Sequence, residues 1–122
     1  MKIRIKGNSV RIRVSKSEVD KFLSDGILQE KTDFGNNTFR YSLKKFHGKN
    51  LSAEFTNGAI AFFVPATSLN EWATTNKVGI EHHLTVGDGN ELYLLLEKDF
   101  KCIDADITED QSDYFENPVK SC

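Results

Sequence analysis

The chain has 122 residues, of which 39% are hydrophobic and 28% charged, and its formal net charge is −2. This length fits one domain with one core, and this composition excludes a wholly disordered chain. No apolar run approaches the roughly 20 residues of a membrane-spanning helix, and the alternating first residues differ from a signal peptide, so we predict a cytoplasmic protein with no membrane partner.

Charge is unevenly distributed along the chain. Residues 1–50 carry 12 Lys/Arg against 5 Asp/Glu, whereas residues 51–122 carry 4 Lys/Arg against 13 Asp/Glu. Such asymmetry is typical either of an anion site in the basic half or of two halves that neutralise each other. The charge distribution leaves both interpretations open.

The first half of the chain predicts a ββαββ unit over residues 1–46. Residues 2–6 and 10–14 alternate between polar and apolar side chains around Gly7-Asn8, which is typical of a hairpin. A helix is expected over residues 15–26, with Ser17 as its N-cap and Gly26 as its C-cap. Two strands should follow near residues 27–33 and 38–45, joined by a turn at residues 35–37.

The second half repeats this order over residues 50–100. Strands are expected at residues 51–55 and 59–64 around Asn57-Gly58, then a helix over residues 67–75 with Thr67 or Ser68 as its cap. Two more strands should lie near residues 77–85 and 91–98. A shift of 50 residues aligns the apolar and capping positions of the halves, which favours an internal duplication over two unrelated meanders.

These elements predict one α+β domain over residues 1–100. Eight strands are too many for one flat sheet of this size, so we expect the duplicated ββαββ units to form a mostly antiparallel curled sheet or barrel with two short helices. Residues 101–122 are expected to form an acidic tail, with Tyr114 and Phe115 as anchors on the domain. Cys102 and Cys122 lie in this tail and are expected to be reduced thiols, with one tail disulfide as the alternative.

Five stretches of the chain together suggest a known family, namely Lys2–Arg11, Glu30–Asn37, Glu71–Ala73, Glu97–Cys102 and Glu109–Asp113. They look like a family of uncharacterised small bacterial proteins. The resemblance covers the whole chain and implies a bacterial origin and a single domain. It implies no activity, so no catalytic residue can be assigned from it.

A second resemblance is architectural. The order of elements is similar to that of the CYTH group, the relatives of adenylate cyclase and thiamine triphosphatase, whose duplicated barrel holds triphosphate in a charged tunnel. This chain begins with Lys2-x-Arg4-x-Lys6 where that group has Glu-x-Glu-x-Lys. The two carboxylates that would bind a metal ion in that group are therefore missing here.

The first hairpin carries the candidate site. If its apolar side chains face one side, its Lys and Arg side chains share the other side, and Arg40 could join them from another strand. Guanidinium groups suit phosphate and carboxylate ligands. The alternative is a solvated outer face partly paired with Glu54 and Glu97. The predicted ligand-binding residues are Lys2, Arg4, Lys6, Arg11, Arg13 and Arg40.

We therefore expect a non-enzymatic binding domain for an anionic ligand or partner, such as a small phosphate or carboxylate compound. One alternative is a small phosphohydrolase that acts on a polyphosphate-like substrate in a barrel lumen, with Glu54 or Glu97 supplying metal or base chemistry. Another is a protein-interaction module that uses the acidic tail, which could also fold over the basic face. Nucleic acid is disfavoured by the pI of about 5.9 and the lack of an aromatic-stacking motif.

No cofactor and no metal site are predicted, and the catalytic residues of any enzyme stay unassigned. The histidines lack metal-ligand spacing, and the tail carboxylates miss the EF-hand pattern. The chain also lacks the Gly-x-Ser-x-Gly, Walker and dinucleotide-binding motifs.

Overall fold

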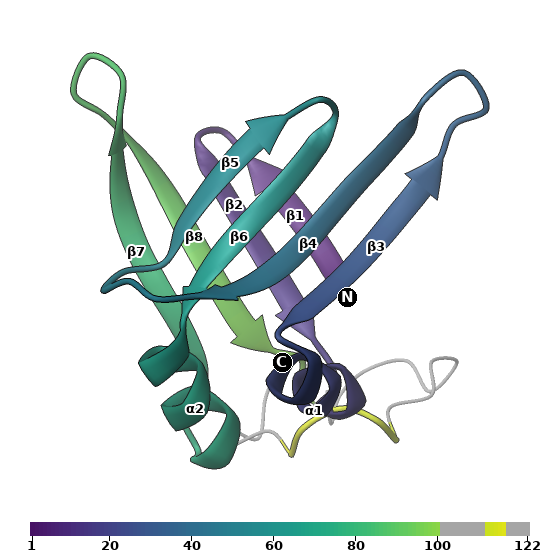
Figure 1. The fold of residues 1–122 in the computed structure, drawn as a ribbon, viewed down its shortest axis with the longest axis vertical. Helices are drawn as coiled ribbons and strands as arrows, with labels where there is room; N and C mark the ends of the chain where they lie inside the picture. Colours follow the sequence, from purple (N-terminus) through teal and green to yellow (C-terminus); the bar gives the residue numbers. More distant parts are fainter. Residues whose placement is uncertain (101–111, 117–122) are drawn as a thin grey trace.

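The computed structural model describes residues 1–100 and 112–116, and it has the α+β class that the sequence predicts (Figure 1). The first half contains β1 (Lys2–Lys6), β2 (Ser9–Val14), α1 (Lys16–Asp25), β3 (Ile27–Asp33) and β4 (Thr38–Phe46). The second half contains β5 (Ser52–Thr56), β6 (Ala59–Pro65), α2 (Ala66–Thr74), β7 (Gly79–Val86) and β8 (Asn90–Lys98). Neither of these helices has the length and apolar character needed to cross a membrane.

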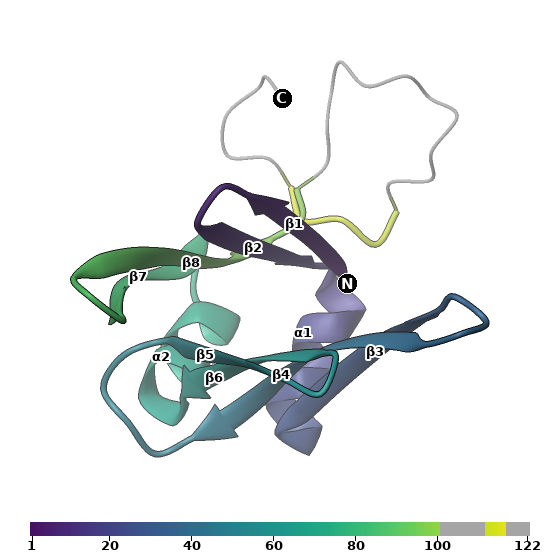
Figure 2. The same cartoon turned by 90° about the horizontal axis from the view of Figure 1, so that it is seen from above.

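The described strands form two four-stranded sheets that lie face to face, with the helices between the layers at one end (Figure 2). Sheet A has the strand order β1-β2-β8-β7, and sheet B has the order β3-β4-β6-β5. The central pairs β2–β8 and β4–β6 are parallel, and the outer pairs are antiparallel. Each sheet therefore combines one hairpin from each half of the chain.

The prediction of one curled eight-stranded sheet or barrel is wrong, because the sheets are separate and do not close. The helices explain this arrangement. In the first half, α1 connects β2 in sheet A to β3 in sheet B. In the second half, α2 connects β6 in sheet B to β7 in sheet A. Each half thus divides its two hairpins between the sheets, and the hairpin of the other half completes each sheet.

The core lies between the inner faces of the sheets and the inner faces of the helices. Ile12 and Leu96 meet in sheet A, Leu43 and Phe62 meet in sheet B, and all four are fully buried. Burial of each such side chain contributes roughly 1.5–3 kcal/mol. The helices add the buried rings of Phe22 and Trp72, and the Trp72 indole N–H donates to the Val78 carbonyl at 3.0 Å.

The two halves have equivalent positions in this core. Ile12 corresponds to Phe62 and Phe22 corresponds to Trp72, each pair 50 residues apart, as the alignment of the sequence predicts. If each strand of sheet A is replaced by its counterpart from the other half, the order β1-β2-β8-β7 becomes β5-β6-β4-β3. This is the strand order of sheet B, read from its other edge. Positions on the two sheets can therefore be compared one by one.

The start of α1 differs from the prediction. Its N-cap is Ser15 rather than Ser17, and the Glu18 carboxylate accepts hydrogen bonds from the Ser15 backbone N–H at 2.9 Å and from its hydroxyl at 3.1 Å. Ser17 instead lies in the first turn, where its backbone N–H and hydroxyl donate to Asp113. The helix ends as predicted at Gly26, whose φ of 74° suits a residue without a side chain.

α2 also begins before its predicted caps. It starts directly after Pro65, so Thr67 and Ser68 lie inside its first turn. Proline is suited to such a helix start because its φ is fixed. At the other end, the Lys98 ammonium donates to the Thr75 carbonyl at 2.8 Å, which satisfies a backbone acceptor that the helix leaves open.

Residues 112–116 dock onto the domain. The Phe115 backbone N–H donates to the Asp99 carbonyl at 2.8 Å, and the Phe115 ring packs edge-on against Phe100. The Lys2 ammonium donates to the Tyr114 hydroxyl at 3.0 Å. These contacts confirm that Tyr114 and Phe115 anchor this segment. Cys102, Cys122 and the carboxylates of Asp104, Asp106, Glu109 and Asp110 lie outside the described residues, and the fold-over of the tail stays a prediction.

Candidate anion site on sheet A

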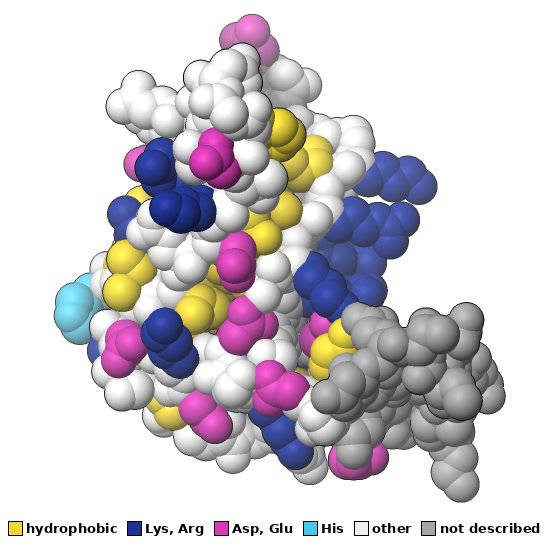
Figure 3. Space-filling model, turned by 90° about the vertical axis from the view of Figure 1, so that its right-hand side faces the viewer, with side chains coloured by type: hydrophobic (Ala, Val, Ile, Leu, Met, Phe, Trp, Pro, Cys, Tyr) yellow, Lys and Arg dark blue, Asp and Glu magenta, His cyan; other side chains and the backbone are white. Residues whose placement is uncertain are grey.

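The basic residues of the first hairpin gather on the outer face of sheet A, as predicted. Val10, Ile12 and Val14 point into the core, so the alternating positions of the hairpin point outward. The register places Lys2 opposite Arg13, Arg4 opposite Arg11 and Lys6 opposite Ser9. Figure 3 shows Lys and Arg side chains in a column along the right margin of the molecule. We call Lys2, Arg4, Lys6, Arg11 and Arg13 the basic face.

Carboxylates neutralise one end of the basic face. Glu97, the β8 neighbour of Arg13, lies 2.5 Å from the Arg13 Nε and 3.8 Å from the Arg11 Nε. At the same end, the Lys2 ammonium lies 3.0 Å from the Asp99 carboxylate. The hydrogen bond to Tyr114 and then the contact with Asp99 raise the pKa of Lys2, despite its partial burial.

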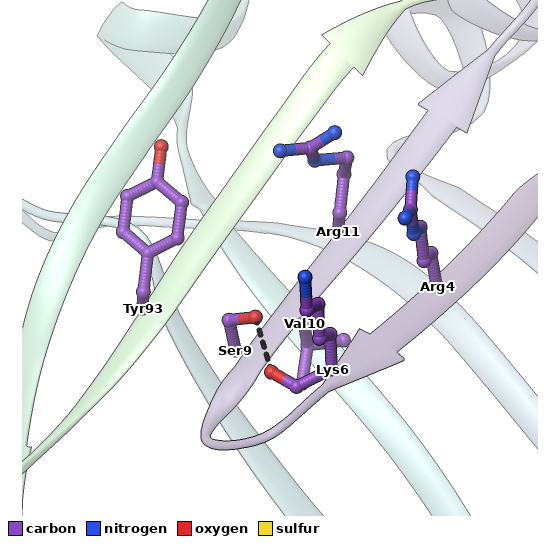
Figure 4. A pocket seen from close by; sticks show the side chains of 6 residues that line it. All are labelled: Arg4, Lys6, Ser9, Val10, Arg11 and Tyr93. Atoms are coloured by element: carbon purple, nitrogen blue, oxygen red, sulfur yellow. Dashed lines mark hydrogen bonds between the residues drawn. The ribbon is translucent and has the colours of Figure 1, made fainter.

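The other end of the basic face has more cations than carboxylates. Among the described residues, Arg4 and Lys6 form no ion pair, and Arg11 has its ion pair only with Glu97, which lies closer to Arg13. These three cations line one hollow of about 160 Å³ (Figure 4). Its lining consists of Arg4, Lys6, Ser9, Val10, Arg11 and Tyr93.

A second hollow of about 170 Å³ lies beside the first. It is lined by Lys2, Ile3, Arg4, Arg11 and Arg13, so Arg4 and Arg11 belong to both. These two arginines are direct cross-strand neighbours, with Cα atoms roughly 4.5–5.5 Å apart. Like charges directly opposite each other destabilise a sheet by a few tenths to about 1 kcal/mol. An anion between the guanidinium groups would turn this repulsion into two attractive contacts.

Tyr93 forms the wall of the first hollow on the β8 side. Its hydroxyl donates to the Glu81 carboxylate, and this hydrogen bond, together with burial, raises the pKa of Tyr93. On the β7 side, the ring of His83 lies 4.9 Å from the Tyr93 ring, between centroids. The His83 Nδ1 lies 3.4 Å from the Glu91 carboxylate. Tyr93 is therefore held by its neighbours on β7.

The structure does not bring Arg40 to the basic face. Arg40 lies on β4 between Lys31 and Ala59, on the outer face of sheet B. Glu54, which the hydrolase alternative uses, lies on that face too, on β5. Of Glu54 and Glu97, the two carboxylates of the hydrolase alternative, Glu97 lies beside the basic face. There it pairs with Arg11 and Arg13. Within residues 1–100 and 112–116, no three His, Cys, Asp or Glu side chains gather in a way that could hold a metal ion.

Three residues that line the hollow were not among the predicted site residues, namely Ser9, Val10 and Tyr93. Val10 was expected only on the apolar side of the hairpin. Ser9 has the same parity as Arg11 in the β2 alternation, so its outward position could have been inferred. Tyr93 could not, because its place depends on the parallel pairing of β8 with β2, more than 80 residues earlier in the chain.

These features define a two-sheet α+β domain with a basic outer sheet face. The chain belongs to a family of unknown function (DUF7009), whose sequence model matches residues 1–119. The predicted membership of a family without an assigned activity is therefore confirmed. No curated protein and no solved structure is significantly similar to the chain.

Proposed function

We propose that this protein is a binding domain for a small phosphate-bearing ligand, held in the hollow by Arg4, Lys6 and Arg11. The observation that carries the proposal is the coincidence of two features. Within the basic face, the cations with the least carboxylate compensation are also the ones that line the hollow. Charge-assisted hydrogen bonds from guanidinium and ammonium groups are the strongest contacts that such side chains can offer a phosphate.

The equivalent surface of sheet B supports a role in binding rather than in folding. Glu54, Thr56 and Ala61 lie on sheet B where Arg4, Lys6 and Arg11 lie on sheet A. The same fold thus forms without cations at these positions. We infer that the two halves arose by duplication and that sheet A alone became specialised for an anion.

Binding of a phosphate requires fewer kinds of functional group at the site than hydrolysis does. A phosphohydrolase needs an acid, a base or a metal ion beside the phosphate, in addition to the cations. Glu97 is the nearest candidate base, but its carboxylate is already in contact with the Arg13 guanidinium, 2.5 Å from the Nε. A binding domain needs the cations alone, so the geometry favours binding.

The thermal unfolding of the protein tests the proposal. We expect phosphate, pyrophosphate or tripolyphosphate to stabilise the fold by about 2.7 kcal/mol at 100 times the dissociation constant, which raises the Tm by several degrees. Sodium chloride at the same ionic strength is the control, and citrate tests a carboxylate ligand. Equal Tm values in all these salts would refute an anion site. Release of orthophosphate from tripolyphosphate with Mg²⁺ would favour the hydrolase instead.

A further inference from the structure

We infer that the ligand carries a planar aromatic ring beside its phosphate, as a nucleoside monophosphate does, and that this ring stacks on Tyr93. This inference rests on the proposed anion site, since the phosphate would occupy the cations described above. The ring would occupy the space over Ser9, between Tyr93 and Lys6.

The register of sheet A creates this space. Lys6, Ser9, Tyr93 and His83 form one row across β1, β2, β8 and β7 on the outer face. Neighbouring strands lie about 4.8 Å apart, so the backbones that carry Tyr93 and Lys6 are separated by roughly 10 Å. Ser9 is the short side chain between these two long ones, as Figure 4 shows. A planar ring in van der Waals contact at about 3.5–4 Å from Tyr93 fits this gap.

Tyr93 is suited to act as a stacking platform. Glu81 holds its hydroxyl, and His83 packs against it from β7 with an angle of 40° between the rings. The hollow lies on the other side of Tyr93, toward β2, and the ring keeps partial exposure there. A side chain that is already fixed loses little conformational entropy when a ligand binds.

The cations lie at a suitable distance from this platform. Arg4 and Arg11 form the next row of the face, two residues along their strands from Lys6 and Ser9. This step corresponds to about 7 Å, which a ribose can span between a stacked base and its phosphate. Stacking of a base on an aromatic side chain tolerates any base, so the inference concerns the class of ligand and not one nucleotide.

Isothermal titration with matched ligands tests this inference. Adenosine monophosphate and uridine monophosphate are compared with ribose 5-phosphate, which has the same phosphate and no ring. We expect both nucleotides to bind the full chain at least tenfold more tightly than ribose 5-phosphate. Tyr93→Leu should remove most of this difference, because it lowers the affinity for the two nucleotides far more than the affinity for ribose 5-phosphate. Tyr93→Phe, which keeps the ring and loses the bond to Glu81, should retain most of the difference.

The outcomes separate this inference from the proposed function. Equal affinities of the wild-type protein for nucleotide and ribose 5-phosphate would overturn the stacking inference and leave the anion site standing. Absence of binding by all three ligands would overturn both. If Tyr93→Leu does not fold, nuclear Overhauser effects between the Tyr93 ring and the base protons in the wild-type protein decide the question. Their absence at saturating nucleotide would contradict the inference.

Discussion

Replacing Arg4 and Arg11 together by glutamine is expected to weaken phosphate binding at least a hundredfold. Each arginine is expected to supply charge-assisted hydrogen bonds to the phosphate, worth roughly 1.5–3 kcal/mol per contact, and tenfold in affinity corresponds to about 1.4 kcal/mol. Because the two guanidinium groups are cross-strand neighbours, the same substitution relieves their repulsion. The Tm without ligand should therefore stay the same or rise slightly. Titration calorimetry and thermal unfolding measure the two effects on one sample.

Arg40→Gln is the matched control for this double variant. Arg40 is an exposed arginine on β4, a central strand of sheet B, so its substitution changes the net charge without touching the hollow on sheet A. We expect the affinity of Arg40→Gln for phosphate to stay within about twofold of the wild-type value, as long-range charge effects are screened by salt. Equal losses in the control and the double variant would assign binding to net charge and contradict a local site.

The second large effect concerns Glu18, which ties the start of the chain to α1. The side chain of Met1 is buried, and its ammonium forms a partly buried pair with the Glu18 carboxylate, with Glu30 farther away at 3.6 Å. Glu18→Gln removes this pair and the charge of the helix cap. We expect the free energy of unfolding at pH 7 to fall by about 1–3 kcal/mol. The loss stays below that for a wholly buried pair because Glu30 remains and Glu18 keeps 23% side-chain exposure.

Glu18 should also make stability depend on pH. Burial by itself would raise the pKa of Glu18, but hydrogen bonds from the Met1 ammonium and from Ser15 outweigh it and hold the pKa below the ordinary 4.5. This stabilisation is complete above pH 4.5 and is lost as the pH falls through the lower pKa of the folded state. Urea unfolding between pH 7 and pH 3 should therefore show a steeper decline for the wild-type protein than for Glu18→Gln. Asp20→Asn, an exposed substitution on α1, should keep the wild-type slope.

The sequence predicted the local elements well because their signals are local. Alternation around Gly7-Asn8 and Asn57-Gly58 defines both hairpins, and the structure places strands there. The barrel prediction failed because alternation does not reveal which strands pair. The parallel pairs β2–β8 and β4–β6 join the two halves of the chain, and the sequence contains no local signal for them.

The same reasoning explains what could be predicted of the candidate site. The basic residues of the first hairpin share one parity, so their common face follows from the sequence alone. Arg40 has a suitable side chain but lies on the other sheet, which only the pairing of β4 reveals. The pairing of β8 with β2 also brings Glu97 and Tyr93 to the basic face. It therefore decides which cations are neutralised and which line the hollow.

Mapping of amide chemical shifts during a phosphate titration tests the anion site most directly. The proposed site predicts saturable shifts of the ¹⁵N–¹H signals in the first hairpin and β8, strongest at Arg4, Lys6, Ser9, Arg11 and Tyr93. Signals of the equivalent surface of sheet B, around Glu54 and Ala61, should stay within the changes produced by sodium chloride at the same ionic strength. Saturable shifts centred on sheet B, or no saturable shift on sheet A, would contradict the assignment of this face as the binding site.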